Sequence, residues 1–461
     1  MSEDLFQGYK GKALETLKKF KVNVWDDAEI ESTGGHFSGK ILPRAENTNE
    51  NHLVLKLSTG YNIGIHIETI TKISGTNHPQ PTFKIPEKVF PYTQGLPHVK
   101  LLGTGGTIAS RLDYRTGAVI PAFAPGELYG AVPELADICN LETEKIFAVF
   151  SENMGPQQYI ALAKKIGEEI EKGIDGIVIG HGTDTLQHTG AALSFMCQNL
   201  PIPVILVGSQ RSSDRPSSDA ALNLMHAMTA AAHGNIAEVM ICMFGPTSDE
   251  YGFLHKGTRV RKMHSSYRST FRTIGNTPLA RVTRQGVFPI KTHYNIRRND
   301  RNVNIIPTFD DRVSMLYYHP GMKADVLDSL IEKGYKGIIW VGTGLGHINK
   351  EMYPAVERAH AAGLHQYMTL QTIWGYVNMF VYDTGRDMMA KGIIPAGNML
   401  PEVALIKLGW ALGQTDDPKE VKRLMLTPIN DEITLREPYN GYLVYQGGVP
   451  EVEEFIKKVH K

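Results

Sequence analysis

The stretch GIVIGHGTDTLQHTGAALSF, from Gly176 to Phe195, joins three patterns in twenty residues. A continuous apolar run ends in the turn HGTDT, and small and apolar residues at helical spacing follow the turn. A continuous apolar run bounded by glycine is typical of a strand buried on both faces of a parallel sheet. The order of strand, glycine turn, hydroxyl-bearing residue and helix therefore predicts one unit of an α/β fold.

The same unit recurs on both sides of this stretch. Apolar runs that end in glycine also occur at VKLLGTGG, IPVILVGSQ and EVMICMFG, and the segments between them have helical character. We expect a larger parallel-sheet α/β domain over residues 98–290 with helices on both faces. A charged segment, 291–312, is expected to link it to a smaller C-terminal α/β domain at 313–461, where VSMLYYHPG, YKGIIWVG and HQYMTL repeat the alternation on a smaller scale.

The first 97 residues have a different character. Residues 1–75 contain short runs of alternating polar and apolar residues with glycine turns between them, which predicts a small antiparallel β-barrel. Residues 76–97 carry five prolines, a density that excludes helices and central strands. We therefore expect an N-terminal barrel-like domain followed by an extended linker.

Composition limits the classes of function. The chain has 461 residues, and its 48 Lys and Arg balance its 48 Asp and Glu, so no global charge attracts nucleic acid or a membrane. Only a local patch could bind RNA, for which Arg297, Arg298 and Arg301 are candidates, and a solvated linker is the alternative. Three widely spaced cysteines, no signal peptide and no long apolar segment predict a soluble cytoplasmic protein without a membrane span.

The glycine-rich turn GTGGTIAS, which begins at Gly103, is not a nucleotide-binding loop. A phosphate loop needs GxxxxGK[ST], and both this pattern and GxGxxG fail at Ile108. A second cluster, GTGLGHIN, fails in the same way at His347. What remains is a hydroxyl, Thr107, at the carboxyl end of a strand, where ligands bind in open parallel sheets. The alternative is that Thr107 only shapes the turn.

The turn HGTDT presents a second hydroxyl, Thr183, followed by a carboxylate, Asp184. An aspartate in this place can also be a simple helix cap. A site would need a base or cation to make a hydroxyl reactive. Six Lys and Arg residues between 256 and 272 supply candidates, although the run can equally be a nucleic-acid patch or a solvated loop. His181, His188 and His255 are interpreted as structural, and without an HExxH motif or paired histidines no metal site is expected.

The motifs TGGTIAS and HGTDT, in this order, resemble those of the L-asparaginase/glutaminase family over residues 98–435. In that family a threonine attacks a side-chain amide and ammonia is released. The resemblance implies that Thr107 is the nucleophile and that Thr183, Asp184 and Lys262, the last in RVRKMH, form a proton-moving triad. Lys256 is the alternative to Lys262.

Further site residues come from the same resemblance. The segment SENMGPQQY is similar to the turn that grips the substrate, which implies that Ser151 and Glu152 hold the α-carboxylate and α-amino groups. Backbone N–H groups near Gly106 and Thr183 are expected to form the oxyanion hole. Tyr114 is a further candidate substrate-binding residue. The family's tyrosine lies further along the chain than Tyr114, which follows Thr107 by seven residues, so this chain departs from the family there.

The N-terminal extension and linker, placed before an asparaginase-like body, resemble the D subunits of archaeal glutamyl-tRNA(Gln) amidotransferases. This implies a glutaminase that hydrolyses glutamine or asparagine and passes ammonia to a partner, the E subunit of the amidotransferase. The partner would hold ATP and Mg²⁺, bind most of the tRNA(Gln) and convert Glu-tRNA(Gln) to Gln-tRNA(Gln), with no cofactor in this chain. An α2β2 assembly containing a homodimer of this chain is implied. A free-standing L-asparaginase/glutaminase and a non-catalytic binding protein are the competing hypotheses.

Overall fold

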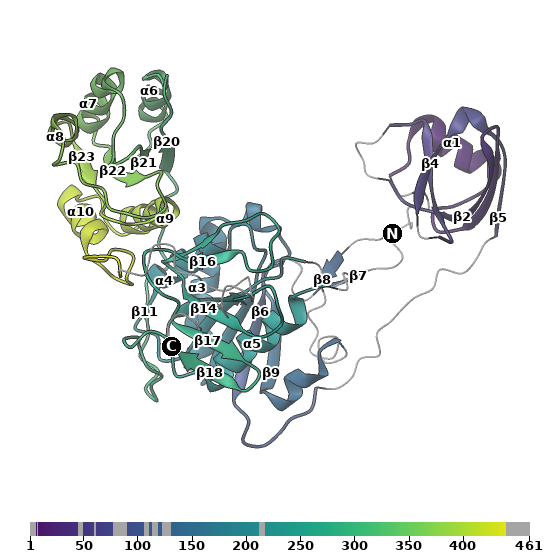
Figure 1. Ribbon diagram of the computed structural model, residues 1–461, viewed down its shortest axis with the longest axis horizontal. Helices are drawn as coiled ribbons and strands as arrows, with labels where there is room; N and C mark the ends of the chain where they lie inside the picture. Colours follow the sequence, from purple (N-terminus) through teal and green to yellow (C-terminus); the bar gives the residue numbers. More distant parts are fainter. Residues whose placement is uncertain are drawn as a thin grey trace, which may run out of the picture. The chain divides into compact units, whose positions relative to one another are not determined.

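The computed structural model describes residues 6, 8–44, 49–59, 61–76, 90–105, 110–112, 119–121, 131–211 and 217–438. Contacts divide the chain into two units, one comprising 1–85 with 112–120 and the other 86–111 with 121–461. A short two-stranded sheet is formed by β7 (Ser110–Leu112) and β8 (Val119–Pro121). Each unit is described below by itself (Figure 1).

The first unit is a five-stranded antiparallel sheet in the order β4-β3-β2-β1-β5. Strand β1 alternates exposed and buried residues, as expected for a sheet with one face in the core. Ala13 and Leu17 of helix α1 and Ile30 of β1 belong to one apolar core, so this domain has a core of its own. The elements are α1 (Gly11–Phe20), β1 (Asp27–Ser32), β2 (Gly35–Ile41), β3 (His52–Leu57), β4 (Asn62–His66), η1 (Ile67–Thr69) and β5 (Ile70–Thr76).

The second unit is built around an eight-stranded sheet in the order β18-β17-β14-β13-β12-β10-β6-β9. The five strands β9, β6, β10, β12 and β13 are parallel. The apolar runs predicted four of them, whereas the polar β9, NLETEK, was not recognised as a strand. The other three are antiparallel, so the sheet is mixed and not wholly parallel. The strands are β6 (His98–Gly103), β9 (Asn140–Lys145), β10 (Gly176–Gly180), β12 (Val204–Val207), β13 (Val239–Phe244), β14 (Gly252–Lys256), β17 (Ala280–Thr283) and β18 (Gly286–Pro289).

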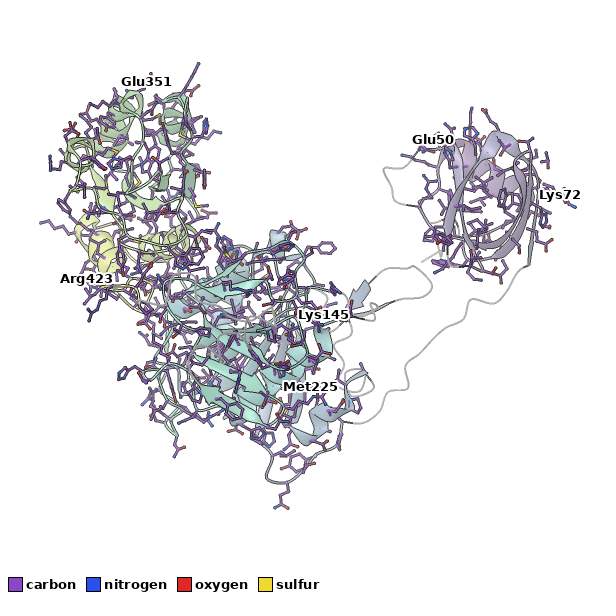
Figure 2. The ribbon with its side chains drawn as sticks, viewed as in Figure 1. Glu50, Lys72, Lys145, Met225, Glu351 and Arg423 are labelled. Atoms are coloured by element: carbon purple, nitrogen blue, oxygen red, sulfur yellow. The ribbon has the colours of Figure 1, made fainter. Side chains whose placement is uncertain are left out.

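Helices cover both faces of this sheet because its central strands are apolar on both. In β10, Ile177 and Ile179 enter the core beneath α3 (Pro156–Glu171) and α4 (Leu186–Met196), whereas Val178 enters the core beneath α5 (Ala220–His233). Figure 2 labels Met225 of α5 and Lys145 at the end of β9. Short elements complete the layer: η2 (Pro133–Asp137), η3 (Ser151–Asn153), the hairpin of β15 (Val260–Lys262) and β16 (Phe271–Thr273), and the pair of β11 (Cys197–Gln198) and β19 (Asn304–Ile305).

A smaller four-stranded sheet, β20-β21-β22-β23, follows in the same unit and is parallel throughout. In β21, Ile338 and Trp340 face the core of the helices α6, α7 and α8, while Ile339 faces α9 and α10. The elements are β20 (Val313–Tyr317), α6 (Asp325–Glu332), β21 (Gly337–Gly342), η4 (Lys350–Met352), α7 (Tyr353–Ala361), β22 (His365–Leu370), α8 (Asp383–Ala390), β23 (Ile393–Pro395), α9 (Pro401–Leu412) and α10 (Pro418–Leu426).

One apolar core joins the two sheets of this unit. Residues of α3 and α4 from the larger layer and residues of α9 and α10 from the smaller one belong to the same buried cluster. The rings of Phe195 on α4 and Trp410 on α9 stack with their centroids 5.8 Å apart. Because such a core is closely packed, the smaller layer is in direct mechanical contact with the larger one.

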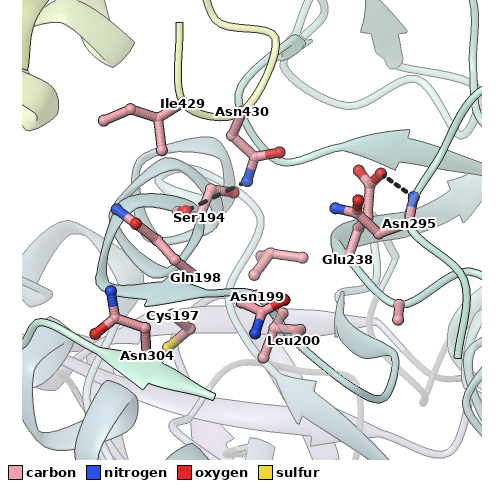
Figure 3. A pocket seen from close by; sticks show the side chains of 12 residues that line it. Ser194, Cys197, Gln198, Asn199, Leu200, Glu238, Asn295, Asn304, Ile429 and Asn430 are labelled. Carbon is pink, nitrogen blue, oxygen red and sulfur yellow. Dashed lines mark hydrogen bonds between the residues drawn. The ribbon is translucent and has the colours of Figure 1, made fainter. Parts of the chain in front are cut away.

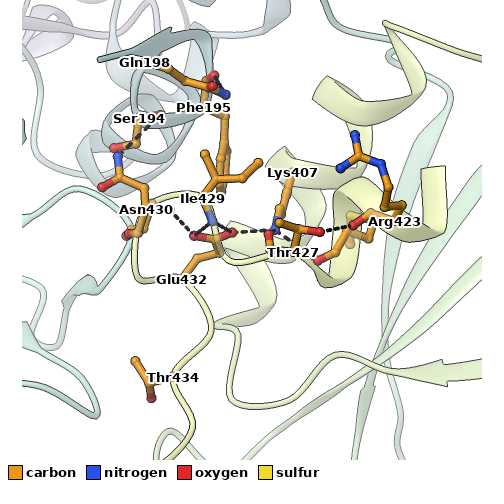
Figure 4. Close-up of polar contacts among 12 residues, drawn as sticks. Ser194, Phe195, Gln198, Lys407, Arg423, Thr427, Ile429, Asn430, Glu432 and Thr434 are labelled. Carbon is orange, nitrogen blue, oxygen red and sulfur yellow. Dashed lines mark hydrogen bonds and ion pairs between the residues drawn. The ribbon is translucent and has the colours of Figure 1, made fainter. Parts of the chain in front are cut away.

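A buried ion pair fixes the chain after α10 (Figure 4). Lys407 of α9 pairs with Glu432, and both side chains are fully buried. Lys407 Nζ also donates to the carbonyl oxygens of Met425 (3.0 Å) and Thr427 (2.7 Å), while Glu432 accepts from the backbone N–H groups of Ile429 and Asn430. These bonds satisfy the charges and hold residues 425–432 against α9.

Candidate active site

The turn between β10 and α4 carries the hydroxyl and the carboxylate that the sequence singled out. The helix N-cap is Thr185, whose Oγ1 donates to the carbonyl oxygen of Ser151 at 2.6 Å. Asp184 precedes this cap, so the interpretation of Asp184 as a simple helix cap is wrong. Gly182 allows η3 to approach the turn, because a Cβ there would lie 2.8 Å from Ser151 Cβ.

Lys262, at the end of β15, reaches this turn from another part of the chain. Its Nζ donates to Thr183 Oγ1 at 2.9 Å and to Asp184 Oδ1 at 2.8 Å. The lysine side chain is 11% exposed, whereas that of Asp184 is 70% exposed. The structure thus brings Thr183, Asp184 and Lys262 into one hydrogen-bonded group whose carboxylate faces solvent. A lysine so placed can accept or return a proton at a neighbouring hydroxyl.

Lys256, the alternative to Lys262, lies elsewhere. It belongs to β14, is buried, and its Nζ pairs with Glu238 Oε2 at 2.8 Å and with Asp431 Oδ2 at 3.2 Å. Asp431 is shared with Lys291. Lys256 therefore neutralises buried carboxylates and does not contact the turn that carries Asp184.

The other cations of the run 256–272 are also held by the protein. Arg259 is buried and donates to the carbonyl oxygens of Asn398 and Glu432. Arg268 pairs with Asp249 and lies over the ring of Phe244, 4.5 Å from its centroid. Arg261 lies beside Glu402 and Arg272 donates to the carbonyl oxygen of Ser269. Residues 263–267 form an exposed loop, but the cations on either side of it are held by the protein and do not form a free nucleic-acid patch.

The first glycine turn lies beside the second at the same edge of the sheet. At the end of β6, the backbone N–H and the Oγ1 of Thr104 both donate to the carbonyl oxygen of Gly180, at 3.1 and 2.9 Å. Gly105 has a φ of +126°, and a Cβ there would lie 2.2 Å from the carbonyl oxygen of Val149, so this position requires glycine. Gly106, Thr107 and Tyr114 lie outside the described residues, and their roles stay predictions.

Ser151 and Glu152, predicted to bind the substrate, lie on η3. Ser151 is buried against Gly182, whereas Glu152 is exposed. Four of the predicted site residues, Ser151, Thr183, Asp184 and Lys262, therefore meet around one turn although they come from three separate segments. The convergence agrees with the rule that sites form at the carboxyl ends of parallel strands.

Two buried histidines support the strands around the site. Burial lowers the pKa of His181 to about 4, which keeps its imidazole neutral. Its Nδ1 lies 2.6 Å from the carbonyl oxygen of Gly182 and must donate, so Nε2 accepts from Thr189 Oγ1 at 2.8 Å. His255, whose pKa burial lowers to about 3, contacts Thr273 Oγ1 at 2.9 Å. The contacts of both rings agree with the structural role expected for them.

A polar cavity of about 320 Å³ lies near the start of β13, at the opposite end of the strands from the turn with Asp184 (Figure 3). It is bordered by the end of α4 and the start of β13, and its lining includes Ser194, Asn199, Glu238, Asn295 and Asn430. Several of these groups are already bonded, such as Asn430 Nδ2 to the carbonyl oxygen of Ser194 and Glu238 Oε1 to the N–H of Asn295. The cavity is separate from the group around Lys262.

Two further searches concern only the described residues. In these parts of the chain, no group of three or more His, Cys, Asp or Glu side chains is placed to hold a metal ion. Within the same ranges, no helix has the length and apolar character needed to cross a membrane.

Comparison with known proteins gives a family match for the N-terminal domain and for each of the two α/β layers. Residues 22–74 match the family described as "GatD N-terminal domain", residues 98–294 "Asparaginase, N-terminal" and residues 312–425 "Glutaminase/Asparaginase C-terminal domain". The D subunit of the glutamyl-tRNA(Gln) amidotransferase of Thermococcus kodakarensis is 45% identical, over 94% of this chain and 99% of the relative. The protein of the same name from Methanopyrus kandleri is also 45% identical, over 92% and 94%.

Solved structures match the second unit. The thermostable L-asparaginase from Thermococcus kodakarensis aligns with a TM-score of 0.65 and 33% identity, covering 73% of this chain and 99% of the asparaginase. L-asparaginase I from Vibrio cholerae aligns with a TM-score of 0.65 and 27% identity, covering 74% and 100%. The asparaginase-like α/β class expected from the sequence is confirmed.

Proposed function

The chain belongs to the family of glutamyl-tRNA(Gln) amidotransferase D subunits, and from this membership we propose that it is the glutaminase of a tRNA-dependent amidotransferase. It hydrolyses the side-chain amide of glutamine or asparagine and supplies ammonia to a partner protein. The observation that carries the chemistry is the contact of Lys262 Nζ with both Thr183 Oγ1 and Asp184 Oδ1.

The proposed reaction has two steps. The hydroxyl of Thr107 attacks the amide carbon, and the C–N bond breaks as the nitrogen leaves with a proton as ammonia. Water then attacks the acyl ester, releasing glutamate or aspartate and restoring the hydroxyl. An amide is a poor electrophile, so splitting the hydrolysis through a covalent intermediate lowers the barrier of each step.

The triad of Thr183, Asp184 and Lys262 moves the protons of this reaction. Threonine is a weak nucleophile at its free pKa, so its proton must be taken as it attacks. In our proposal the amine of Lys262 accepts it through the Thr183 hydroxyl, Asp184 stabilises the resulting ammonium, and the proton is returned to the leaving nitrogen. The short distances of 2.9 and 2.8 Å around Lys262 Nζ support this transfer.

The remaining site residues bind the substrate. Ser151 and Glu152 hold the α-carboxylate and α-amino groups, and the position of η3 against Gly182 supports this assignment. Backbone N–H groups at Gly106 and Thr183 stabilise the oxyanion. Tyr114, in the segment that follows Thr107, is a further candidate for binding the substrate.

The partner completes the reaction. We propose that it is the E subunit of the amidotransferase, which holds ATP and Mg²⁺, activates the glutamate of Glu-tRNA(Gln) by phosphorylation and binds most of the tRNA, while this chain needs no cofactor. The working assembly is an α2β2 heterotetramer in the cytoplasm, with this chain as a homodimer. The extension matched at residues 22–74 supports this over the alternative of a free-standing L-asparaginase, to which only the second unit corresponds.

The test is glutamine-dependent formation of Gln-tRNA(Gln) by this chain together with the E subunit from the same organism, Glu-tRNA(Gln), ATP and Mg²⁺. Thr107→Ala should abolish product formation with glutamine but not with added ammonium chloride, because the partner's own step stays intact. Brisk hydrolysis of asparagine by the chain alone, without any Gln-tRNA formation alongside the E subunit, would favour the free-standing asparaginase.

A further inference from the structure

The strand that carries Lys262 presents two faces to two different parts of the unit. Lys262 points to the turn with Thr183 and Asp184. Alternate residues of a strand face opposite sides, and Arg261 and Arg259 contact acceptors of the smaller layer instead. Arg261 Nε lies 3.6 Å from Glu402 Oε1, and Arg259 Nη1 donates to the carbonyl oxygens of Asn398 (2.9 Å) and Glu432 (3.2 Å).

Of these three acceptors, Asn398 and Glu432 accept through backbone carbonyl oxygens, whereas Glu402 is contacted through its carboxylate. It lies in the first turn of α9, where a carboxylate is favoured by the helix dipole, but it is only 5% exposed. A buried carboxylate needs a counter-charge, and Arg261 supplies it. Within the described residues, Oε1 of Glu402 has no hydrogen-bond partner, so its interaction with Arg261 is one of charge.

The same carboxylate also acts on the helix that follows Asp184. His188 lies on α4, four residues after Asp184 and one helical turn further on. Its side chain is half-buried, with a buried Nδ1; burial lowers its pKa, and the neighbouring charges of Glu402 and Arg261 act on it with opposite signs. Glu402 lies beside the strand that carries Lys262, at the start of α9, which packs on the helix that begins just after Asp184.

Packing fixes Glu402 with respect to both elements. Helices α4 and α9 share one apolar core, in which Phe195 and Trp410 stack. The backbone of α9 thus cannot shift without disturbing α4. The carboxylate of Glu402 is held at a defined place beside the hairpin by the smaller layer.

On the basis of the proposed function, we infer that Glu402 is a positioning residue for the proton-moving triad. Through Arg261 it fixes the strand of Lys262, and through the packing of α9 on α4 it holds that strand in place relative to the helix following Asp184. Glu402 does not touch the substrate. Removing the charge of Glu402 keeps all three triad side chains in the protein. It frees Lys262 to move relative to Thr183 and Asp184, which lowers the rate of proton transfer.

The test compares four variants of the full chain in glutamine hydrolysis: Glu402→Gln, Arg261→Met, the double variant and Lys262→Met. We expect Glu402→Gln and Arg261→Met each to lower kcat by about 10- to 100-fold with little change in KM, since misplacing a catalytic group by about 1 Å costs this much. The double variant should be no slower than the slower single one, because both remove the same interaction.

The matched control is Arg358→Met, which removes an exposed charge pair with Asp328 from the same smaller layer. It should leave kcat and KM unchanged. A Glu402→Gln variant with unchanged kcat, beside an inactive Lys262→Met, would overturn the positioning role and leave the proposed function standing. Additive losses in the double variant, or a loss of kcat that only follows a lowered thermal midpoint, would also overturn it. Full activity of Lys262→Met would instead reject the proposed function.

Discussion

Two lysines six residues apart have different tasks, and substitution of each should have a different effect. Lys262→Met removes the amine that contacts Thr183 Oγ1 and Asp184 Oδ1. We expect kcat for ammonia release from glutamine to fall by about 10²- to 10⁴-fold, the usual contribution of a positioned acid or base. Because its partner Asp184 is 70% exposed, no buried charge loses its counter-charge, and the thermal midpoint should change little.

Lys256→Met is the matched comparison for that prediction. It leaves Glu238, which is 3% exposed, without its counter-charge, and we expect a destabilisation of about 3–5 kcal/mol. The folded fraction should keep its kcat. If Lys256→Met abolished turnover in fully folded protein while Lys262→Met did not, the two assignments would have to be exchanged.

Buried histidines make the stability of the second unit depend on pH. Burial lowers the pKa of His181 and His226 to about 4 and that of His255 to about 3, below the value of an unfolded histidine. Below about pH 6.5 the unfolded chain therefore binds protons that the folded chain does not. The free energy of unfolding accordingly decreases as the pH is lowered from about 6.5 to about 4. Each ring contributes about 1.4 kcal/mol per pH unit in this window.

Calorimetric thermal midpoints between about pH 7 and about pH 5 measure this dependence. His255→Asn places an amide near Thr273 Oγ1 and removes one titrating ring, so its midpoint should fall less steeply than that of the parent chain. An equal slope in the variant would mean that His255 is already charged in the folded protein.

At the residue scale, the family resemblance predicted Thr183, Asp184 and Lys262, which the structure brings together, whereas the residues alone could not choose between the two lysines. Thr183 and Asp184 were recognisable because they follow a buried strand directly. Lys256 and Lys262 are both cations in one charged run, and only their tertiary contacts show that Lys262 reaches Asp184 whereas Lys256 pairs with Glu238. Glu402 gave no signal, because it is 140 positions downstream of Lys262 and reaches the hairpin only through tertiary packing.

Among the elements of the large sheet, four of the five parallel strands were predictable and the antiparallel ones were not. Strands β6, β10, β12 and β13 are continuous apolar runs, a pattern that few alternatives share. Strand β14, in contrast, contains His255 and Lys256, which conceal a fully buried strand within a charged segment. Their burial depends on partners distant in the sequence, Thr273 and Glu238, which no local pattern reveals.

The arginines at 297, 298 and 301 are used by the protein to hold one segment in place, not left free for RNA. Arg297 donates to the carbonyl oxygens of Ala231 (2.8 Å) and Gly234 (3.1 Å) at the end of α5, and Arg301 donates to that of Ile174 (2.8 Å). A cation at this place satisfies carbonyls that have no partner within the helix.

We therefore expect Arg297→Met to destabilise the second unit by about 3 kcal/mol, because the carbonyl oxygens that accept from Arg297 lose their donor. Arg423→Met, which removes an exposed pair with Glu420, should cost less than about 1 kcal/mol. Thermal midpoints of the two variants measure the difference. An RNA-binding role would appear instead as a weakened salt dependence of Gln-tRNA formation in Arg297→Met, with no loss of stability.

At the scale of the whole molecule, the change from alternating runs to continuous apolar runs predicted two kinds of domain. The proline-rich segment between them could be recognised because proline excludes both helix and central strand. What the sequence could not reveal is the shared core of α4 and α9, which makes the two α/β layers one compact unit. Both helices are apolar on nearly every face, and such a pattern does not identify the neighbour that covers each face.

The last prediction concerns the separation of hydrolysis from transfer. The first unit has its own core, and the second contains both matched asparaginase domains, at residues 98–294 (apart from 112–120) and 312–425. Deletion of residues 1–85 should therefore leave a folded body that releases ammonia from glutamine in a Lys262-dependent manner. Glutamine-dependent Gln-tRNA formation with the E subunit should be lost, because the remaining asparaginase-like body lacks the part that distinguishes this family from plain asparaginases. Formation of Gln-tRNA from added ammonium by the partner should continue. If the truncated chain still supported glutamine-dependent product formation at the parent rate, the first unit would have no part in coupling, and the features that distinguish this family from asparaginases would have to be sought within the body itself.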